Sequence, residues 1–170
     1  FAKGYSYSVN SVKCTVVEGG IDKSITNLGL AGKPSATIGG KEYPYVTING
    51  TDWLCRNISD ESAGAPYDNY IAMSDVFGRY YSYEEALTIC PEGWRLPTND
   101  EWTAALAAHD NKIAALMGNG YFNDELMWEY WPAVGDINNA SGLSLIPVGY
   151  SLLSSKATDP KQDAHIDGTY

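Results

Sequence analysis

Hydrophobic and polar residues alternate most regularly in residues 45–58 (YVTINGTDWLCRNI). Val46 and Ile48 alternate with tyrosine or polar neighbours, which is the two-residue period of a β-strand. Asn49-Gly50 follows, and this pair is the strongest short signal for a hairpin because both residues tolerate positive φ. Residues 51–58 form the expected return strand. The pattern therefore predicts an antiparallel hairpin.

A helical pattern follows in residues 83–89 (YEEALTI). Ser82 is placed to cap this helix, and two glutamates fall in its first turn, where the helix dipole favours carboxylates. Tyr83, Leu87 and Cys90 have the spacing of one helical face, and we expect them to form its buried stripe. The Pro/Gly-rich turn after Cys90 is expected to end the helix.

A second helix is predicted immediately after Thr98. Thr98 and Glu101 have the S/T-x-x-E spacing of a capping box, in which each side chain accepts a hydrogen bond from the other residue's backbone amide. Trp102, Ala105 and Leu106 fall on one face of this helix. We therefore expect Trp102 to belong to the core.

The remaining segments have weaker patterns. Residues 1–43 contain short alternating stretches and several glycines, which predict a β-rich extension or the tail of a preceding domain. Residues 59–75 and the polar residues from Ser151 onward are expected to be loops. A third, short helix is predicted over residues 111–117, with Asp110 as its cap.

The composition is that of a globular protein with an acidic surface. Hydrophobic residues make up 44% of the chain, and 21 acidic residues against 11 basic ones give a formal net charge of -10. Such a surface repels phosphate backbones, so we expect no nucleic-acid partner. No apolar run approaches the roughly 20 residues of a membrane span, so we expect no membrane insertion. The chain opens at Phe1 without a Met, and we expect an exported, matured product.

The aromatic residues suggest a binding surface. The chain has thirteen Tyr and five Trp but three Phe, a bias typical of recognition modules and equally of β-rich folds. Aromatic and acidic residues gather most densely between residues 121 and 131. The candidate ligand-binding residues are Tyr121, Asn123, Asp124, Trp128, Tyr130 and Trp131. Packing of these rings in the core or at an interface remains the alternative.

No motif in the chain indicates catalysis. His109 and His165 are far apart in sequence and belong to no ligand-spaced cluster, and no local triad is present. Acidic pairs such as Asp60-Glu61 offer oxygens to Ca²⁺, but acidic loop residues are commonly just solvated. We therefore expect no metal and no cofactor. Arg95 and Glu101 are expected to fix their turn by hydrogen bonds to the backbone.

Four stretches together resemble a known family. Val46-Thr47-Ile48-Asn49-Gly50 with Trp53 and Arg56-Asn57-Ile58 resembles V-x-I-G-x-Q-x-W-M-A-E-N-L. Gly78-Arg79-Tyr80-Tyr81 with Glu85-Ala86 resembles G-R-L-Y-x-W-x-x-A. Cys90-Pro91 with Gly93 to Thr98 and Glu101-Trp102 resembles C-P-x-G-W-H-L-P-S-x-x-E-W, and residues 139–150 resemble N-x-S-G-F-x-x-L-P-x-G-Y. In this order the blocks resemble the Fibrobacter succinogenes major paralogous domain of Bacteroidota-type exported proteins.

This resemblance implies an α+β fold of the C-type-lectin-like kind, with short helices packed on a small antiparallel sheet and long loops. It places the major paralogous domain in residues 44–170, after the N-terminal extension 1–43. It implies a non-catalytic module of a secreted or surface-anchored lipoprotein, acting in adhesion or recognition of a glycan or protein. The alternatives are a structural or assembly module of a surface or pilus-like protein, and a degenerate relative of the formylglycine-generating enzymes. Within that framework Trp53 and Trp94 are expected in the core.

The chain departs from the family pattern in its cysteines. The family's late strand, whose cysteine is expected to pair with the one at Cys90, has no match before Tyr170. Cys55 replaces the family's usual alanine, and Cys14 lies outside the matching blocks. With three cysteines one is left free, intermolecular or paired elsewhere. A Cys14–Cys55 disulfide is the expected pairing, tying the N-terminal strand to the hairpin.

Overall fold

The computed structural model describes residues 6–9, 12–18, 20–67, 70–128 and 135–149. The strands are β1 (Ser6–Val9), β2 (Val12–Val17), β3 (Gly20–Ile21), β4 (Ile25–Thr26), β5 (Ser35–Ile38), β6 (Lys41–Ile48), β7 (Thr51–Leu54), β8 (Ala65–Pro66), β9 (Arg79–Tyr80), β10 (Tyr121–Phe122) and β11 (Glu125–Leu126). The helices are α1 (Ser74–Phe77), α2 (Tyr83–Ile89) and α3 (Asn99–Ala107), with 3₁₀ turns η2 (Ile71–Met73) and η3 (Ile113–Ala115).

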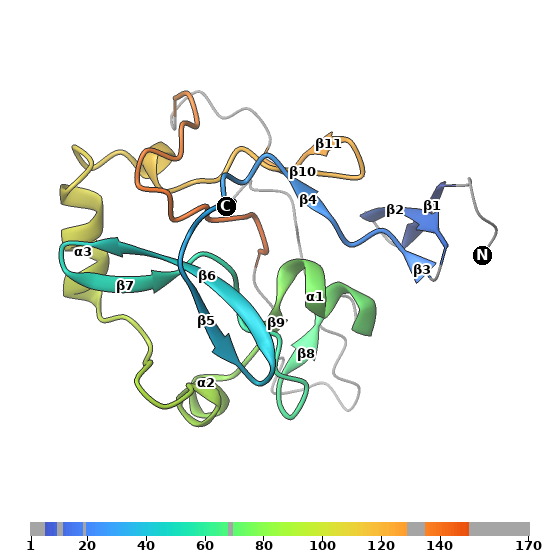
Figure 1. Ribbon diagram of the computed structural model, residues 1–170, viewed down its shortest axis with the longest axis horizontal. Helices are drawn as coiled ribbons and strands as arrows, with labels where there is room; N and C mark the ends of the chain where they lie inside the picture. Colours follow the sequence, from blue (N-terminus) through green and yellow to red (C-terminus); the bar gives the residue numbers. More distant parts are fainter. Residues whose placement is uncertain (1–5, 10–11, 19, 68–69, 129–134, 150–170) are drawn as a thin grey trace, which may run out of the picture.

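The fold is α+β, as predicted. Its strands form the sheets β1-β2-β3, β11-β10-β4, β5-β6-β7 and the pair β8-β9, and every pairing in them is antiparallel. In Figure 1 the β5-β6-β7 sheet lies at the centre, with α3 at its far end and α2 below it. No helix in the described ranges has the length and apolar character needed to cross a bilayer.

The predicted hairpin is confirmed as β6–β7, although its return strand ends at Leu54 and not at Ile58 as predicted. Asn49 and Gly50 form its turn with φ of 52° and 78°, the left-handed conformations that favour these residue types. The Asn49 side chain also donates to the backbone oxygen of Ala104, 2.9 Å away, and so joins the turn to α3. β6 is longer than predicted because its first half pairs with β5, which precedes residue 43.

Both predicted helix caps are confirmed. Ser82 with Glu85, and Thr98 with Glu101, form complete capping boxes in which each side chain accepts a hydrogen bond from the other's backbone amide. These bonds satisfy amides that have no partner inside the helix, so short sequences fix where α2 and α3 begin.

The predicted buried face of α2 is wrong. Tyr83 and Leu87 are 68% and 54% exposed, and no residue of α2 is buried. Ala86 and Ile89 are half-buried instead, and they line a hollow with Cys90. In a two-turn helix both stripes have helical spacing, so periodicity alone cannot choose between them.

The helix α3 packs as predicted. Ala105 is buried, and Trp102 and Leu106 cover a core cluster of Ile48, Trp53, Ala105, Ala115, Leu116 and Leu143. The rings of Trp53 and Trp102 lie 4.7 Å apart between centroids. Trp53 is therefore a core residue as expected.

Two expectations near α3 need correction. Trp94 is only half-buried and meets Tyr45 edge-on, with ring centroids 6.0 Å apart. The predicted third helix reduces to η3, which has no side-chain cap. Asp110 and Asn111 both have φ of 56°, which interrupts the helical conformation before that turn.

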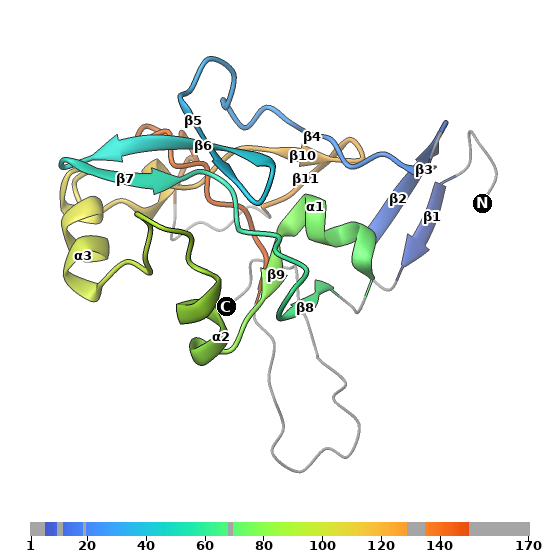
Figure 2. The same cartoon turned by 60° about the horizontal axis from the view of Figure 1, so that its bottom comes forward.

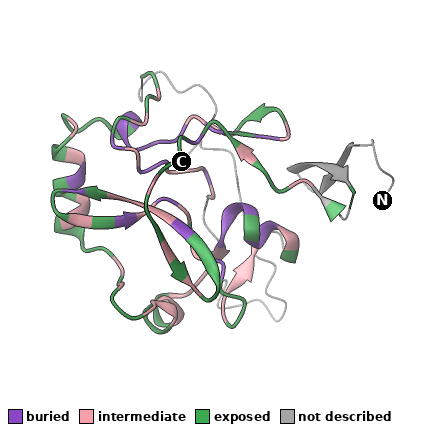
Figure 3. Cartoon of the chain, viewed as in Figure 1, coloured by how far each residue is buried: buried purple, intermediate pink, exposed green. Residues whose placement is uncertain are grey.

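A short helical segment, η2–α1, replaces the loop expected up to residue 75. Met73, Val76 and Phe77 are buried and form a second core cluster with Tyr67, Phe122 and Met127. Figure 3 shows α1 largely in the buried colour.

The Gly78-Arg79 pair fixes the entry to β9. Gly78 has a φ of 82°, and a Cβ added there would lie 2.4 Å from Cβ of Asn57, so no larger residue fits without a shift. Arg79 donates to the backbone oxygens of Ala63 and Gly64 and to Oγ of Ser74. This motif therefore has a structural role.

Asn139 holds the segment after η3. It has a φ of 50°, and its Nδ2 donates to Oγ of Ser144 at 2.9 Å and to the backbone oxygen of Leu28 at 3.3 Å. Its Oδ1 accepts from the backbone amide of Ser144 at 2.9 Å. One side chain thereby joins residues 139–144 to the segment after β4.

The predicted Cys14–Cys55 disulfide is not present. Cys55 is a free, buried thiol whose Sγ donates to the backbone oxygen of Gly142, 3.4 Å away. Cys14 lies on β2, whose small sheet stands at the opposite end of the molecule from β7 in both Figure 1 and Figure 2. Because Cys55 is a free thiol, this disulfide is not formed in the structure.

Candidate binding site

The sheet β11-β10-β4 presents an exposed face built from three side chains. Tyr121 of β10 pairs with Thr26 of β4 on one side and with Leu126 of β11 on the other. Directly paired residues point to the same side of a sheet, so these three side chains share a face, called here the ribbon face. Tyr121 and Leu126 are 37% and 44% exposed, and β11 is exposed along its length in Figure 3.

The opposite side of this ribbon faces the core. Phe122 is buried and meets Phe77 edge-on, with ring centroids 5.6 Å apart. This contact orients β10, since anchoring one side of a strand places the next residue on the other side. Phe122 therefore holds the Tyr121 ring outward.

A two-residue turn joins β10 to β11. Asn123 and Asp124 have φ of 51° and 64°, which is the geometry of a tight hairpin and suits these two residue types. Asp124 is exposed and Asn123 half-buried. Polar side chains thus border the exposed ring of Tyr121 at one end of the ribbon face.

Trp128 has a structural contact. It is half-buried, and its Nε1 donates to the backbone oxygen of Leu145 at 3.1 Å. The indole therefore links the hairpin to the segment that Asn139 holds. Of the six predicted ligand-binding residues, Tyr121, Asn123 and Asp124 are brought together on the hairpin, and Tyr130 and Trp131 lie outside the described residues.

The turn before α3 has the structural role predicted for it. Arg95 forms a two-pronged ion pair with Glu101, with N–O distances of 2.7 and 2.5 Å, and also donates to the backbone oxygen of Leu96. Glu101 accepts from the backbone amide of Thr98 as well. The hydrogen bonds from Arg95, then from Thr98, lower the pKa of Glu101 to about 2.

An apolar hollow of about 240 Å³ lies between α2, β9 and the segment at Val148. Cys90 is half-buried at its edge, and it is a free thiol. The other described thiol, Cys55, lies elsewhere and has its pKa raised by burial. The hollow therefore does not bring these two thiols together.

A polar pocket of about 290 Å³ lies where β6 and the segment after β7 meet α1. Lys41, Arg56, Ser59 and Asp75 line it, and sequence reasoning did not identify it. The sequence does hold one indication of this pocket. Lys41 and Tyr43 are two residues apart on one strand, so their polar groups lie on the same side of the sheet.

Carboxylates do not cluster in the described part of the chain. Within those ranges, no group of three or more His, Cys, Asp and Glu side chains is arranged to hold a metal ion. The acidic pair Asp60-Glu61, considered for Ca²⁺, instead has Asp60 accepting from the backbone amide of Ser62 at 2.8 Å.

Comparison with known proteins gives one match. A search of curated proteins and a search of solved structures each returned no match. A family model, described as the Fibrobacter succinogenes major domain, matches residues 43–165. The match begins within β6 and covers all four sequence blocks, from the β6–β7 hairpin to the segment after Asn139. The chain therefore belongs to the Fibrobacter succinogenes major domain family.

Proposed function

We propose that this chain is a non-catalytic recognition module of an exported bacterial surface protein, with a C-type-lectin-like arrangement of its α+β elements. The module binds a glycan or a protein through the ribbon face. The observation that carries this proposal is the outward Tyr121 ring, held between Thr26 and Leu126 and bordered by the polar turn.

The chemistry of this face suits a sugar. A tyrosine ring offers a flat apolar surface for the C–H groups of a pyranose and a hydroxyl at its edge. Asp124 and Asn123 add oxygens and an amide within two or three residues of that ring, where they can meet sugar hydroxyls. The -10 charge of the chain opposes anionic polymers at this face, so a neutral glycan fits it best.

A glycan array with two tyrosine variants tests the proposal. The purified chain should bind a subset of neutral glycans, and Tyr121→Ala should weaken that binding about tenfold or more, as expected for removal of a central aromatic anchor. Tyr83→Ala is the matched control, because Tyr83 is an exposed tyrosine on α2 and not on the ribbon face.

Two results would count against the glycan proposal. The first is a folded wild-type chain that binds no glycan on the array. The second is a glycan signal that Tyr83→Ala reduces as strongly as Tyr121→Ala.

An assembly module is the second candidate, and α2 favours it. Tyr83 and Leu87 are one helical turn apart and exposed, beside the apolar hollow that Ala86 and Ile89 line. Exposed apolar side chains beside an open hollow are typical of contact surfaces between proteins. Under this proposal the double variant Tyr83→Ser/Leu87→Ser reduces co-purification with neighbouring surface proteins, whereas Tyr121→Ala leaves it unchanged. Equal retention of partners by the double variant would rule this candidate out.

A further inference from the structure

The polar pocket between β6 and α1 contains an arginine whose donors are only partly used. Nη2 of Arg56 donates to the backbone oxygens of Asp75 and Val76, at 2.9 and 3.1 Å. Among the described residues, nothing accepts from its Nε or Nη1, and no carboxylate forms an ion pair with it. Arg79 differs, since its Nε, Nη1 and Nη2 all donate.

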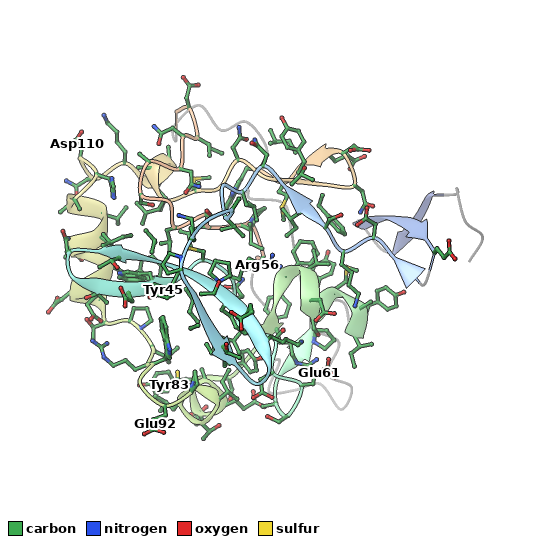
Figure 4. All side chains as sticks on the ribbon, viewed as in Figure 1. Tyr45, Arg56, Glu61, Tyr83, Glu92 and Asp110 are labelled. Atoms are coloured by element: carbon green, nitrogen blue, oxygen red, sulfur yellow. The ribbon has the colours of Figure 1, made fainter. Side chains whose placement is uncertain are left out.

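Arg56 is also partly removed from water. Burial lowers the pKa of its guanidinium, which Figure 4 labels in the middle of the view. The Asp75 carboxylate attracts this guanidinium only at longer range and forms no ion pair with it, which is unusual because buried charges are normally paired. Arg56 lines the polar pocket, where a bound anion would complete the pairing.

The rest of the pocket wall is a connected set of polar groups. Nζ of Lys41 donates to Oγ of Ser59 at 2.9 Å and to Oδ1 of Asp75 at 3.0 Å. The hydroxyls of Ser59 and Tyr43 lie 3.2 Å apart, and both side chains are buried. These bonds fix the positions of the polar groups before any ligand arrives, which lowers the entropy cost of binding.

The local charge is opposite in sign to that of the whole chain. Lys41 and Arg56 line the pocket together with the carboxylates of Asp75 and Glu42, and Lys23 beside it has its Nζ 2.5 Å from Oδ2 of Asp75. The Glu42 carboxylate accepts a hydrogen bond from Oγ1 of Thr37 on β5, and Glu42 points to the opposite side of β6 from Lys41. Glu61 acts on Lys41 only by longer-range attraction and lies toward β8 in Figure 4. Three cations against the carboxylates of Asp75 and Glu42 leave one positive charge in excess around the pocket, on a chain of net charge -10. That pocket attracts a small anion.

We propose that this pocket binds the carboxylate of an acidic sugar, such as a uronic acid, with Arg56 holding the carboxylate and the charge of Lys41 attracting it. The planar guanidinium fits the two oxygens of a carboxylate. Asp75 and Ser59 then meet the sugar hydroxyls, and the charge of Asp75 disfavours a doubly charged phosphate. A volume of about 290 Å³ is at the lower end of ligand pockets, which suits one sugar ring.

This site goes beyond the proposed function. It uses side chains of β6, α1 and the segment after β7, and none of the ribbon face. Tyr121→Ala should therefore leave binding at this pocket unchanged, whereas Lys41→Gln should leave binding of a neutral glycan at the ribbon face unchanged. Failure of one proposal can thus be told from failure of the other.

The test is a titration of the full chain followed by amide NMR shifts. D-glucuronate should shift amides in residues 41–43, 56–59 and 74–76, with a dissociation constant on the order of 1 mM for so small a ligand. D-glucose, which lacks the carboxylate, should shift none of them at the same concentration. Lys41→Gln should weaken glucuronate binding about tenfold, as expected for loss of a positive charge close to the bound carboxylate.

Two further variants separate binding from folding and general charge. Arg56→Lys keeps the charge but loses the planar fork, and it should weaken glucuronate binding while leaving the amide spectrum dispersed. Lys112→Gln makes the same charge change as Lys41→Gln at a site 68% exposed and remote from the pocket, and should have no effect.

Four results would overturn the proposal. If glucose causes the same shifts as glucuronate, the pocket does not recognise the carboxylate. Undiminished binding by a folded Lys41→Gln variant would show that glucuronate does not bind in this pocket. Tighter binding of inorganic phosphate than of glucuronate would replace the sugar with a phosphate ligand. Equally tight binding of N-acetylglutamate would make the ligand an acidic peptide group.

Discussion

Replacing Asn139 by alanine should destabilise the chain by about 2–3 kcal/mol. The change removes three hydrogen bonds that Asn139 makes to Leu28 and Ser144. Each such bond contributes about 1 kcal/mol net, and the longest, at 3.3 Å, contributes less. Alanine also tolerates the left-handed conformation less well than asparagine, which adds up to about 1 kcal/mol. Solvent access to this part-buried site offsets some of the loss.

Urea unfolding followed by tryptophan fluorescence measures this effect. With a slope of about 2 kcal/mol per molar urea, the loss corresponds to a midpoint lower by about 1–1.5 M. Asn138→Ala is the matched control, because its Oδ1 accepts one bond, at an exposed site, from the backbone amide of Ala140. That variant should lose no more than about 1 kcal/mol.

A glycine at the same position separates the two causes. Asn139→Gly loses the same side-chain bonds but adopts positive φ freely, so it should be less destabilising than Asn139→Ala by about 0.5–1 kcal/mol. Loss of stability in Asn139→Ala no greater than in Asn138→Ala would refute the hydrogen-bond account. Identical midpoints for the glycine and alanine variants would refute the backbone account.

Three other outcomes are expected. Thr98→Ala should lower the free energy of unfolding by about 1 kcal/mol, because it removes the cap of α3. The control Thr103→Ala, inside the same helix, should lower it by less than about 0.5 kcal/mol. Equal urea midpoints for the two variants would contradict the role of the cap. In a Cys14→Ser background, a thiol reagent should label half-buried Cys90 in the native chain and buried Cys55 only on unfolding, so early labelling of Cys55 would contradict its burial. Hydrogen bonding from Lys23 lowers the pKa of Asp75 in the folded chain. The ionised Asp75 side chain therefore stabilises the fold fully above pH 3.8, the pKa of the unfolded chain, and this stabilisation is lost as pH falls through the lower pKa of the folded chain. The difference in free energy of unfolding between wild type and Asp75→Asn should therefore shrink as pH falls from 5 to 3. A difference that grows over this range would contradict the lowered pKa.

Local signals predicted the parts of the fold that local bonds hold. The Asn49-Gly50 turn and the caps at Ser82 and Thr98 are fixed by groups within a few residues of one another, so their sequence patterns were sufficient. The α1 segment was missed because its burial depends on Tyr67 and on Phe122, which lies far along the chain. No pattern within residues 71–77 contains that information.

In the candidate sites too, only residues that are close together in sequence could be identified before the structure was known. Tyr121, Asn123 and Asp124 could be chosen as candidates because they are adjacent in sequence, although the hairpin turn between β10 and β11 was not predicted. The role of Trp128 depends on Leu145, 17 residues away. The polar pocket could not be predicted, since Lys23, Arg56 and Asp75 come from three separate segments. Only folding brings their charges together.

The tight β10–β11 turn gives this chain a natural place for added sequence. Both turn residues lie at the tip of a hairpin that Phe122 anchors from behind, so a few residues inserted between Asn123 and Asp124 leave the anchored strand in place. Variation in length at this tip would change the shape of the surface beside Tyr121 without rebuilding the core. The same tip is therefore where a foreign peptide could be grafted for display.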